Sequence, residues 1–540
     1  MTALFSRTFL AASLAAAFTL VAATQALAAT IPPGTVLADK QEFVRNNGAE
    51  PETLDPALAE TNVAHNLTRD LFEGLTAKDN EGRVVPGIAE SWRQVDANTW
   101  TFRLRANATW SNGDPVTAED FVYAWRRFLD PKTASKYAAT FAVFVNNGTE
   151  ITKGTKQPAD LGIRALDRLN LEIKTPYPVG FMPELVSNSQ FGPVHKATID
   201  RHGKEWTKPA NMVGNGAYVL KDWQVNNRVV LEKNPRYWDA RNVVLTRVTY
   251  LPVEDGNADL KLYQSGEVHW MNQLPPGSFD KMKAEYPREI RNSTLLGLRY
   301  YSLLASDPLL KDVRVRKALS MVIDRNILAD KVTADGQVPA YSVIIKGLAG
   351  AEVTSYDWVS WPMERRVAEA KKLLAEAGVA PGAKLKFAYN TSEYHKTMAI
   401  FAASEWKNKL GLELELENME FKVLLERRHK GTYQIARNGW GADYNDATNF
   451  LTLVQCDSEQ NDNKNCNRQA EALIKQGNES TDPAKRTQLL TQAAKMIMDD
   501  YPMIPLLQNT RPRLVKSFVG GFSPNNSMDV FRSKELYLIK

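Results

Sequence analysis

Residues 437–446 decide how the rest of this chain is interpreted; they read Arg437-Asn438-Gly439-Trp440-Gly441-Ala442-Asp443-Tyr444-Asn445-Asp446. An apolar strand, predicted over residues 433–436, leads into this stretch, which we expect to be a loop. Its two glycines lack a Cβ and let another chain approach the backbone closely. Asp443 can hold an ammonium group and Arg437 a carboxylate. The stretch therefore fits a ligand that is a short zwitterionic backbone, and it equally fits a surface hairpin with a loop salt bridge.

Length and composition describe a soluble globular protein of more than one lobe. The chain has 540 residues, more than one core supports, so we expect two or three lobes. It is 44% hydrophobic and 24% charged, which is ordinary for this class. The net charge of +5 comes from 67 basic and 62 acidic residues without a long basic run. Nucleic-acid binding is therefore not indicated.

The first 28 residues have the pattern of a secretory signal peptide. Arg7 provides the positive charge, residues 9–21 form an apolar, alanine-rich segment, and Ala26-Leu27-Ala28 is a small-x-small cleavage site. No later segment reaches about 18 uninterrupted apolar residues. The residue after the predicted cleavage is Ala29 rather than cysteine, so no lipid anchor is expected. We expect an exported protein, located in a bacterial periplasm.

The chain has two cysteines, Cys456 and Cys466, which flank a polar loop. In an oxidising compartment, such a pair is expected to form a local disulfide. A pair of metal ligands is the alternative interpretation, although no histidine or third cysteine lies near.

Strands and helices alternate in two regions, which predicts two α/β lobes. In the first half, a strand is predicted within residues 91–105, and Thr117 with Asp120 forms a variant capping box at the start of a helix. A helix is predicted over 65–75, with residues 60–62 as a polar loop before it. In the second half, helices are predicted over 364–377, 395–410, 421–429 and 480–498. A last strand is predicted over 513–519.

Motifs for catalysis are missing from the sequence. It contains no Gly-x-Ser-x-Gly elbow, no His-Glu-x-x-His motif, no phosphate loop and no dinucleotide fingerprint. Its six histidines are scattered, so we expect neither a metal ion nor a cofactor. Two α/β lobes that close on a ligand about a hinge need no such motif. The sequence therefore favours a binding protein over an enzyme.

Many short blocks along the mature chain match one known family in the same order. These are Val44-Arg45-Asn46-Asn47-Gly48, Asp70-Leu71-Phe72-Glu73-Gly74-Leu75, residues 110–121, Lys221-Asp222-Trp223, Asp312-Val313-Arg314-Val315-Arg316, residues 369–378, Tyr389-Asn390-Thr391-Ser392, Arg428-His429-Lys430-Gly431-Thr432, residues 440–445 and Arg513-Leu514-Val515-Lys516. Together they resemble the periplasmic oligopeptide-binding proteins of peptide ABC transporters, solute-binding protein family 5.

The resemblance implies an α/β fold of the periplasmic binding protein type II-like kind, with three lobes. Residues 29–73, 197–296 and 511–540 are expected to form the first lobe. Residues 74–196 are expected to be an inserted second lobe, and residues 297–510 a third. A peptide would lie extended between the first and third lobes and pair by β-strand addition. The implied partners are this peptide and an inner-membrane ABC permease, with the binding protein itself a monomer.

The family's binding positions also carry over to this chain. The resemblance assigns Asp443 to the peptide's ammonium group, and it assigns Gly439, Gly441 and the segment Glu60-Thr61-Asn62 to pairing with its backbone. The remaining positions are the cations that meet the peptide's carboxylate at different lengths, a backbone-contacting asparagine and two pocket walls: Arg437, Arg428 and His395; Asn272; Trp440 and Tyr137.

Departures from the family's enteric members leave the ligand open. Those members have a disulfide at two positions that are Gly297 and Gly441 in this chain. The alternative within the family is a murein tripeptide-binding protein, with Arg428 as the partner of the extra carboxylate. The alternatives of another class are an exported peptidase and a periplasmic chaperone.

Overall fold

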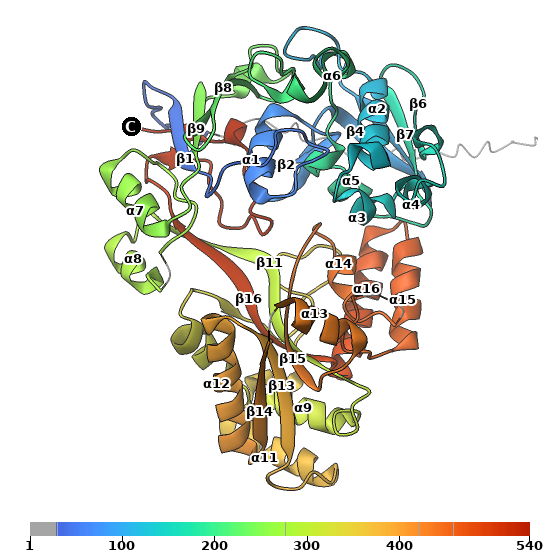
Figure 1. Cartoon of the computed structure of the whole chain (residues 1–540), viewed down its shortest axis with the longest axis vertical. Coiled ribbons are helices and arrows are strands. Elements are labelled where there is room, and N and C mark those ends of the chain that lie inside the picture. The colour runs from blue at the N-terminus through green and yellow to red at the C-terminus, as the bar shows by residue number, and fades with distance from the viewer. Residues whose placement is uncertain (1–28, 30, 276, 420, 457, 459) are drawn as a thin grey trace, which may run out of the picture.

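The computed structural model describes residues 29, 31–275, 277–419, 421–456, 458 and 460–540. Two bodies are joined by two long strands, β11 (Ile290–Leu303) and β16 (Met503–Leu514), which run from one body into the other (Figure 1). The upper and lower bodies are named here after their places in Figure 1. The predicted signal peptide, residues 1–28, lies outside the described residues.

The upper body contains two four-stranded sheets and short helices. The first sheet has the order β1 (Glu42–Asn46), β10 (Arg247–Leu251), β9 (Arg228–Lys233), β8 (Tyr218–Gln224). The second has the order β4 (Ala89–Asp96), β5 (Thr99–Leu104), β7 (Asn170–Lys174), β6 (Ile163–Ala165). The helices are α1 (Asn62–Leu71), α2 (Ala118–Leu129), α3 (Ala138–Ala142), α4 (Gly148–Thr152), α5 (Met182–Leu185), α6 (Lys196–His202), α7 (Gly256–Ser265) and α8 (Phe279–Glu285). Two short ladders add β2 (Thr76–Lys78) with β3 (Val84–Pro86) and β17 (Val519–Gly520) with β18 (Tyr537–Leu538).

The lower body is built on one six-stranded sheet. Its order is β12 (Val338–Pro339), β16, β11, β15 (Ile435–Gly441), β13 (Lys384–Asn390), β14 (Glu413–Met419). The helices are α9 (Val313–Val322), α10 (Arg325–Ile327), α11 (Met363–Glu376), α12 (Glu393–Leu410), α13 (Phe421–Lys430), α14 (Ala447–Leu451), α15 (Arg468–Glu479) and α16 (Pro483–Asp499).

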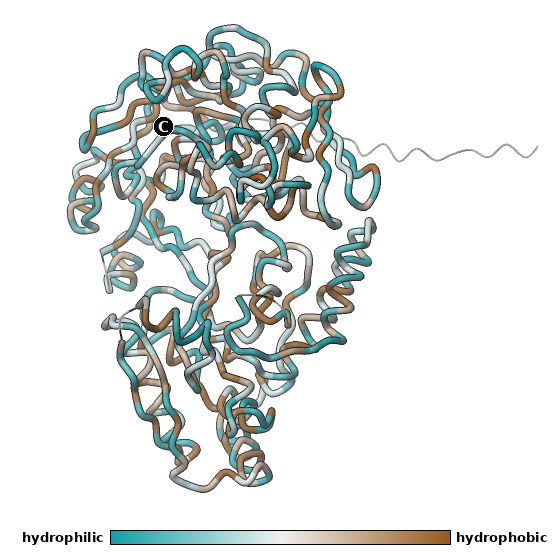
Figure 2. Tube along the Cα trace, turned by 45° about the vertical axis from the view of Figure 1, so that its right-hand side comes forward, coloured by the Kyte–Doolittle hydropathy of each residue, from teal (hydrophilic) through white to brown (hydrophobic). Residues whose placement is uncertain are grey.

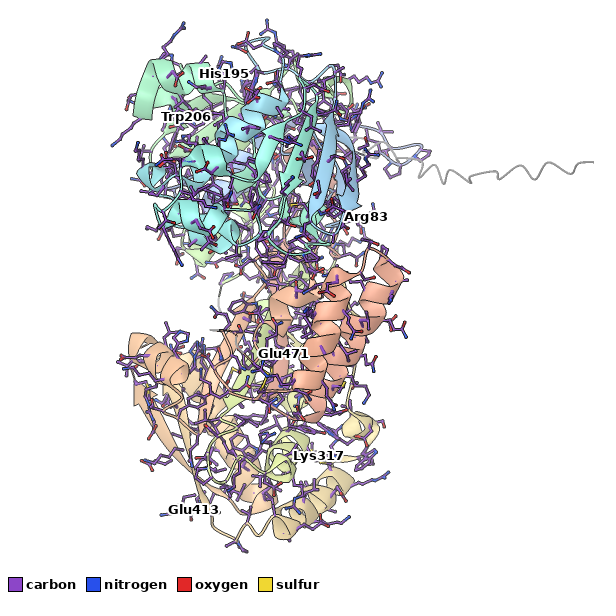
Figure 3. The ribbon with its side chains drawn as sticks, turned by 90° about the vertical axis from the view of Figure 1, so that its right-hand side faces the viewer. Arg83, His195, Trp206, Lys317, Glu413 and Glu471 are labelled. Carbon is purple, nitrogen blue, oxygen red and sulfur yellow. A yellow bond between two sulfur atoms is a disulfide. The ribbon has the colours of Figure 1, made fainter. Side chains whose placement is uncertain are left out.

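Each body has its own large hydrophobic core. Trp110 and Trp125 are fully buried in the upper core, whereas Trp358 and Trp406 are fully buried in the lower one. Hydrophobic positions accordingly occur throughout both bodies in the hydropathy view (Figure 2). Burial of such large side chains is the main favourable contribution to folding. The side view shows Arg83, His195 and Trp206 on the upper body, and Lys317, Glu413 and Glu471 on the lower one (Figure 3).

The two long strands correct the sequence prediction. A strand was expected over 513–519, but β16 ends at Leu514 and pairs antiparallel with β11, for which no residue range was predicted. Pro505 and Pro512 lie inside β16. Proline has no backbone N–H to donate to a β-ladder, so its presence argued against predicting a strand here. The register shifts between Thr294 and Leu298, which marks an irregularity midway along β11. The predicted lobe boundaries at 296/297 and 510/511 fall within these strands, and the three-lobe division stays a prediction.

Predictions with a local signal agree with the structure. Thr117 precedes α2, and its N–H donates to Asp120 Oδ2 at 2.8 Å, completing the predicted capping box. Helix α12 ends before Gly411, which has φ +71° and caps it as a C-terminal glycine does. The first helix, however, begins at Asn62 rather than at residue 65, because the Thr61 side chain caps it by accepting from the Ala64 N–H.

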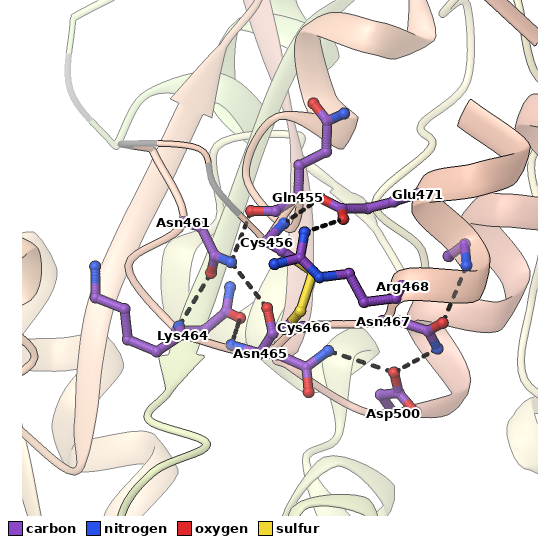
Figure 4. Close-up of a disulfide and its surroundings, with 12 residues drawn as sticks. Gln455, Cys456, Asn461, Lys464, Asn465, Cys466, Asn467, Arg468, Glu471 and Asp500 are labelled. Atoms are coloured by element: carbon purple, nitrogen blue, oxygen red, sulfur yellow. Dashed lines mark hydrogen bonds and ion pairs between the residues drawn. A yellow bond between two sulfur atoms is a disulfide. The ribbon is translucent and has the colours of Figure 1, made fainter. Parts of the chain in front are cut away.

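The predicted disulfide is present. Cys456 and Cys466 are bonded, and this closes a polar loop beside α15 (Figure 4). The Cys456 N–H donates to Glu471 Oε1 at 2.7 Å, and the Asn467 amide donates to Asp500 Oδ2 at 2.9 Å. The loop is therefore attached to α15 and to the end of α16. The alternative, a pair of metal ligands, is excluded for these two sulfur atoms.

The described residues lack a membrane-spanning helix and a cluster of metal ligands. Within that part of the chain, no helix is both long enough and apolar enough to cross a membrane. The same residues contain no group of three or more His, Cys, Asp or Glu side chains placed to hold a metal ion.

Candidate functional site

A cavity of about 330 Å³ lies where the two bodies meet. It is lined by the start of α1, by the crossing strands near residues 295–297 and 509–513, and by the loop that follows β15. Six of the predicted site residues line it: Glu60, Asn62, Tyr137, Asn272, Gly441 and Asp443. The structure thus brings together residues from distant parts of the sequence. The other six predicted positions do not line this cavity.

The negative charge of the Asp443 carboxylate is only weakly compensated by other groups of the protein. Its Oδ2 accepts a hydrogen bond from the Asn449 amide at 3.4 Å, and no cation among the described residues forms an ion pair with it. Burial raises the pKa of Asp443 above its usual value, and the hydrogen bond from Asn449 offsets this only in part. Burial and the charges of Asp443 and Glu60 also raise the pKa of Tyr137, which places all three groups close together. A ligand ammonium would relieve this accumulation of negative charge.

The loop that carries Asp443 is fixed to the upper body. Tyr444 is buried in the upper core, where its ring stacks on Phe181 with a centroid distance of 4.7 Å. Phe144 packs edge-on against the same ring at 5.6 Å. The Asn445 N–H donates to Glu184 Oε1 at 2.8 Å. The position of the Asp443 backbone is therefore determined by contacts from both bodies.

Strand β15 has one paired edge and one open edge. Ala442 N–H donates to Leu296 O at 2.8 Å, and Leu304 N–H donates to Gln434 O at 3.0 Å, so the even-numbered residues face β11. Backbone groups alternate along a strand, so the odd-numbered residues direct theirs to the opposite edge. On that side β13 pairs with residues 435 and 436. Past these, no strand of the described residues covers the edge.

This edge contains Arg437, Gly439 and Gly441. The sequence analysis predicted a loop from residue 437, and this prediction is wrong because β15 continues to Gly441. The reason is the long antiparallel pairing with β11, which a local pattern does not reveal. Gly441 lies directly opposite Gly297, and a Cβ placed on Gly441 would meet nothing within 4 Å. The backbone there is open to a second chain. In this structure, the Gly439 N–H donates a hydrogen bond to Asn438 Oδ1 at 2.8 Å.

Cations gather beside the start of this edge. Arg437 Nη2 lies 2.8 Å from His395 Nε2. Burial, followed by the charges of Arg437 and Arg299, lowers the pKa of His395 to about 4, so the ring is neutral at pH 7. Burial, Arg428 and Arg299 likewise lower the pKa of Arg437 to about 10, which leaves it charged. Since His395 Nε2 accepts from Arg437, its Nδ1 carries the proton, and this atom is buried without a partner among the described residues. The group can donate to an anion.

Arg428 has an anionic partner within the protein. It is buried, its Nε lies 3.2 Å from Asp462 Oδ2, and it donates to the Asn438 side chain. A ligand carboxylate would have to share Arg428 with Asp462.

The segment Glu60-Thr61-Asn62 is not a free strand edge. The N–H groups of Glu60 and Thr61 both donate to Glu52 Oε1, at 2.7 and 2.9 Å. Asn62 is the first residue of α1. In this structure, the segment can therefore offer a peptide its acceptors and side chains, but its first two N–H groups are already engaged.

The two remaining predicted positions are held by specific contacts. Asn272 N–H donates to Asp259 Oδ2 at 3.0 Å, and its amide lies against Gly48, where a Cβ would come within 2.3 Å of the amide nitrogen. Gly48 has φ +88°, so both its backbone and its neighbour favour glycine. Trp440 packs against the lower core and donates from Nε1 to Asn449 Oδ1 at 2.8 Å.

Sequence reasoning missed several residues of the site. Asn449 contacts both Trp440 and Asp443 and so positions them, and Arg299 joins the cationic group. Neither has a motif around it; Asn449 lies three residues after the Asp446 cap of α14, and Arg299 lies in the strand that was not predicted.

Comparison with known proteins supports one family. A family model described as bacterial extracellular solute-binding proteins, family 5 Middle, matches residues 83–462. The periplasmic oligopeptide-binding protein OppA of Escherichia coli (strain K12) is 42% identical over 544 residues, covering 100% of both chains. The periplasmic murein peptide-binding protein MppA of the same organism is 39% identical, covering 95% of this chain and 97% of its own. The probable deoxycholate-binding periplasmic protein YgiS, also of this organism, is 39% identical, covering 96% and 97%.

Two solved structures differ in how closely they match the present one. The structure described as MppA, unliganded open form, gives a TM-score of 0.90 at 38% identity, covering 94% of this chain and 99% of its own. Haemophilus influenzae OppA in complex with the peptide RPPGFSPFR gives 0.70 at 37% identity, covering 93% and 100%. Identity and coverage are nearly equal, and the present structure matches the unliganded open form more closely than the peptide complex. Its fold is the predicted α/β, type II-like fold of periplasmic binding proteins, and the chain belongs to family 5 of the bacterial extracellular solute-binding proteins.

Proposed function

We propose that this protein captures short oligopeptides in extended form and delivers them to an inner-membrane ABC permease. The observation that carries the proposal is the open edge of β15 with opposite charges at its two ends. Asp443 follows the strand, whereas Arg437 and His395 lie at its start. A peptide is a backbone with an ammonium group at one end and a carboxylate at the other, and it matches this arrangement.

The edge also suggests a direction and a length. With the ammonium group at Asp443 and the carboxylate toward Arg437, the peptide would run antiparallel to β15. At roughly 3.3 Å per residue, the chain from 437 to 443 spans roughly 20 Å. Extended peptides of about three to five residues, with the same rise per residue, fit within this span. Main-chain hydrogen bonds would supply the affinity, and they are the same for every peptide sequence.

Closure about β11 and β16 completes the proposed mechanism. Those strands link the bodies and would act as the hinge between the predicted lobes, 29–73 with 197–296 and 511–540, 74–196, and 297–510. A ligand shifts the equilibrium toward the closed form because that form contacts it on both sides. The protein is periplasmic, like its relatives, and is a binding protein rather than an enzyme. We propose that it acts as a monomer.

Mass spectrometry of ligands released by denaturing the purified protein tests the proposal directly. We expect a mixture of peptides of about three to five residues. Calorimetry with tri- to pentapeptides should then give binding, whereas deoxycholate, the control ligand suggested by one relative, should not bind. Finding a bile salt and no peptide would contradict the proposal. Turnover of the peptide by pure protein would favour a peptidase, and binding of unfolded protein would favour a chaperone.

A murein tripeptide is the second candidate ligand, supported by the 39% identity to MppA. Its additional carboxylate would need Arg428, which in this structure is paired with Asp462. Competition between murein tripeptide and trilysine distinguishes the two. We expect no strong preference for the murein tripeptide; a clear preference that Arg428→Gln abolishes would favour this second candidate.

A further inference from the structure

One end of the cavity is formed by arginines that the proposed peptide contacts do not use. Arg45 of β1, Arg69 of α1, and Arg511 and Arg513 of β16 line it together with Asp529. Arg513 Nη2 lies 2.6 and 2.7 Å from the two oxygens of Asp529, and Arg511 Nη1 lies 2.8 Å from the same carboxylate. Asp529 interacts electrostatically with all four arginines, and the buried Asp70 interacts in the same way with Arg45.

Among these four arginines, Arg45 has the fewest hydrogen-bond partners for its guanidinium group. It is 3% exposed, and neither its Nε nor its Nη1 has a hydrogen-bond partner among the described residues. Its guanidinium lies over the rings of Trp270 and Tyr250, at 5.0 and 5.4 Å from their centroids. Ring contacts act on the face of the guanidinium, whereas its N–H groups point outward in the plane. The cation–π contacts therefore leave these donors unsatisfied.

Within the arginine group itself, the buried polar atoms without a partner are donors. The buried nitrogens of Arg45, Nε of Arg513 and Nε1 of Trp270 all lack a partner among the described residues. Arg513 lies over the same Trp270 ring at 5.2 Å, so these groups form one cluster. Arg69 donates to Asn66 Oδ1 at 3.1 Å, a neutral acceptor. Unpaired buried donors are costly, and a charged acceptor compensates several of them at once.

Other charged groups of the cavity do not supply this acceptor. Glu184 is paired with Lys78, and Glu60 with Lys136 at 3.2 Å. Asp443, which also lines the cavity, accepts from the Asn449 amide. The cavity wall therefore carries two kinds of charged group. One is the Asp443 carboxylate, and the other is a set of guanidinium groups whose hydrogen-bond donors are not all paired.

We propose that this arginine end is a subsite for an oxyanion. This inference rests on the proposed function. The oxyanion is then the side-chain carboxylate of an acidic residue at the first or second position of the peptide, next to the ammonium group at Asp443. A free inorganic oxyanion such as sulfate has the same chemistry and is the second source. Guanidinium groups bind either one through charge-assisted, bidentate hydrogen bonds.

Calorimetry with matched tetrapeptides tests the subsite. The peptides are Glu-Ala-Ala-Ala and Ala-Glu-Ala-Ala, with the same two sequences carrying Gln in place of Glu. In wild-type protein we expect one acidic peptide to bind about tenfold or more tightly than its Gln counterpart. Arg45→Gln should remove this preference while binding of the Gln peptides continues. Arg201→Gln, which removes an exposed arginine on α6, is the matched control and should preserve the preference.

A second arm uses sulfate and needs no variant. At constant ionic strength, sulfate should weaken binding of the acidic peptide and leave the Gln peptide unchanged. If sulfate alone raises the Tm of wild type more than that of Arg45→Gln, a free oxyanion also occupies the subsite. If Arg45→Gln fails to fold, Arg69→Gln, which is only half-buried, replaces it. Equal affinities for Glu and Gln peptides together with no sulfate effect overturn the subsite, and the proposed function then survives. Absence of binding by all four peptides contradicts the proposed function, and the sulfate arm still decides on the subsite.

Discussion

The ring of Tyr444 lies parallel to that of Phe181, with an angle of 2° between their planes. Tyr444 follows β15 of the lower body, whereas Phe181 belongs to the core of the upper body. The loop with Asp443 is thus docked while the two bodies are still open. We infer that the ammonium end of the site is assembled before the ligand arrives, and that closure then covers the rest of the β15 edge.

Removing this contact should weaken both the fold and the site. Tyr444→Ala deletes a buried aromatic side chain, which costs about 3–5 kcal/mol, and frees the loop that holds Asp443. Urea denaturation and calorimetry with a tripeptide measure the two effects. Tyr444→Phe is the matched control, because it keeps the ring and removes only the hydroxyl, whose contact with Thr448 is long at 3.5 Å. A Tyr444→Ala variant with unchanged peptide affinity would show that the docked loop does not matter for binding.

Peptide affinity should fall as the pH falls. Burial raises the pKa of Asp443 in the free protein, and a bound ammonium group lowers it again. A group whose pKa is lowered on binding contributes affinity above its free-state pKa and loses it below. Dissociation constants measured by calorimetry from pH 7 to pH 4 should therefore rise, and Asp443→Asn should flatten the dependence. A profile that is the same in this variant would assign the effect to another group.

The contribution of His395 to peptide affinity should change with pH in the opposite direction to that of Asp443. Its pKa is lowered to about 4 in the free protein, and a bound carboxylate would raise it. Its contribution to affinity therefore grows as the pH falls toward 4. In His395→Gln, the loss of affinity at acid pH should be steeper than in wild type, and the same calorimetric series measures it. A shallower loss would mean that His395 does not meet an anion.

Binding should close the molecule. The open arrangement leaves the β15 edge uncovered, and closure would bring the upper body against it. Small-angle X-ray scattering should show a smaller radius of gyration when a saturating tetrapeptide is added. An N-acetylated and amidated peptide, which lacks both charges, serves as the control. An unchanged radius with calorimetrically proven binding would contradict the hinge.

Elements with local signals were predictable from the sequence. The Thr117 capping box and the glycine after α12 each act within a few residues, so the pattern alone indicates them. The crossing strands β11 and β16 were not predictable, because their pairing partners lie about 200 residues away and Pro505 argues against a strand. The extension of β15 to Gly441 depends on the same pairing.

The candidate site divides in a similar way. Asp443 and Gly441 were predicted from the pattern of residues 437–446 and Tyr137 from the family resemblance, and all three line one cavity in the structure. Arg45, Arg513 and Asn449 had no signal of their own, because each acts through neighbours from other segments. Partnerships of this kind, including the pair of Arg428 and Asp462, become visible only in the folded chain.

Arg437 should bind the peptide's carboxylate. Arg437→Gln should cost about 1–3 kcal/mol with a free peptide and much less with the same peptide amidated at its C-terminus. The four calorimetric measurements form a double-mutant cycle, which isolates the interaction between the two groups. Arg427→Gln, which removes an arginine of α13 that is paired with Glu417, is the control. Equal losses with free and amidated peptide would mean that Arg437 has a structural role only.

Asp443 carries the central claim, that the site recognises a peptide by its ammonium group. Calorimetry should compare wild type with Asp443→Asn, each with a tripeptide and with its N-acetylated form. We predict that the substitution costs about 3–5 kcal/mol with the free amine, roughly 100-fold or more in Kd. With the acetylated peptide, which binds weakly to both proteins, the substitution should have little effect. Unchanged affinity of Asp443→Asn for the free tripeptide would contradict the account.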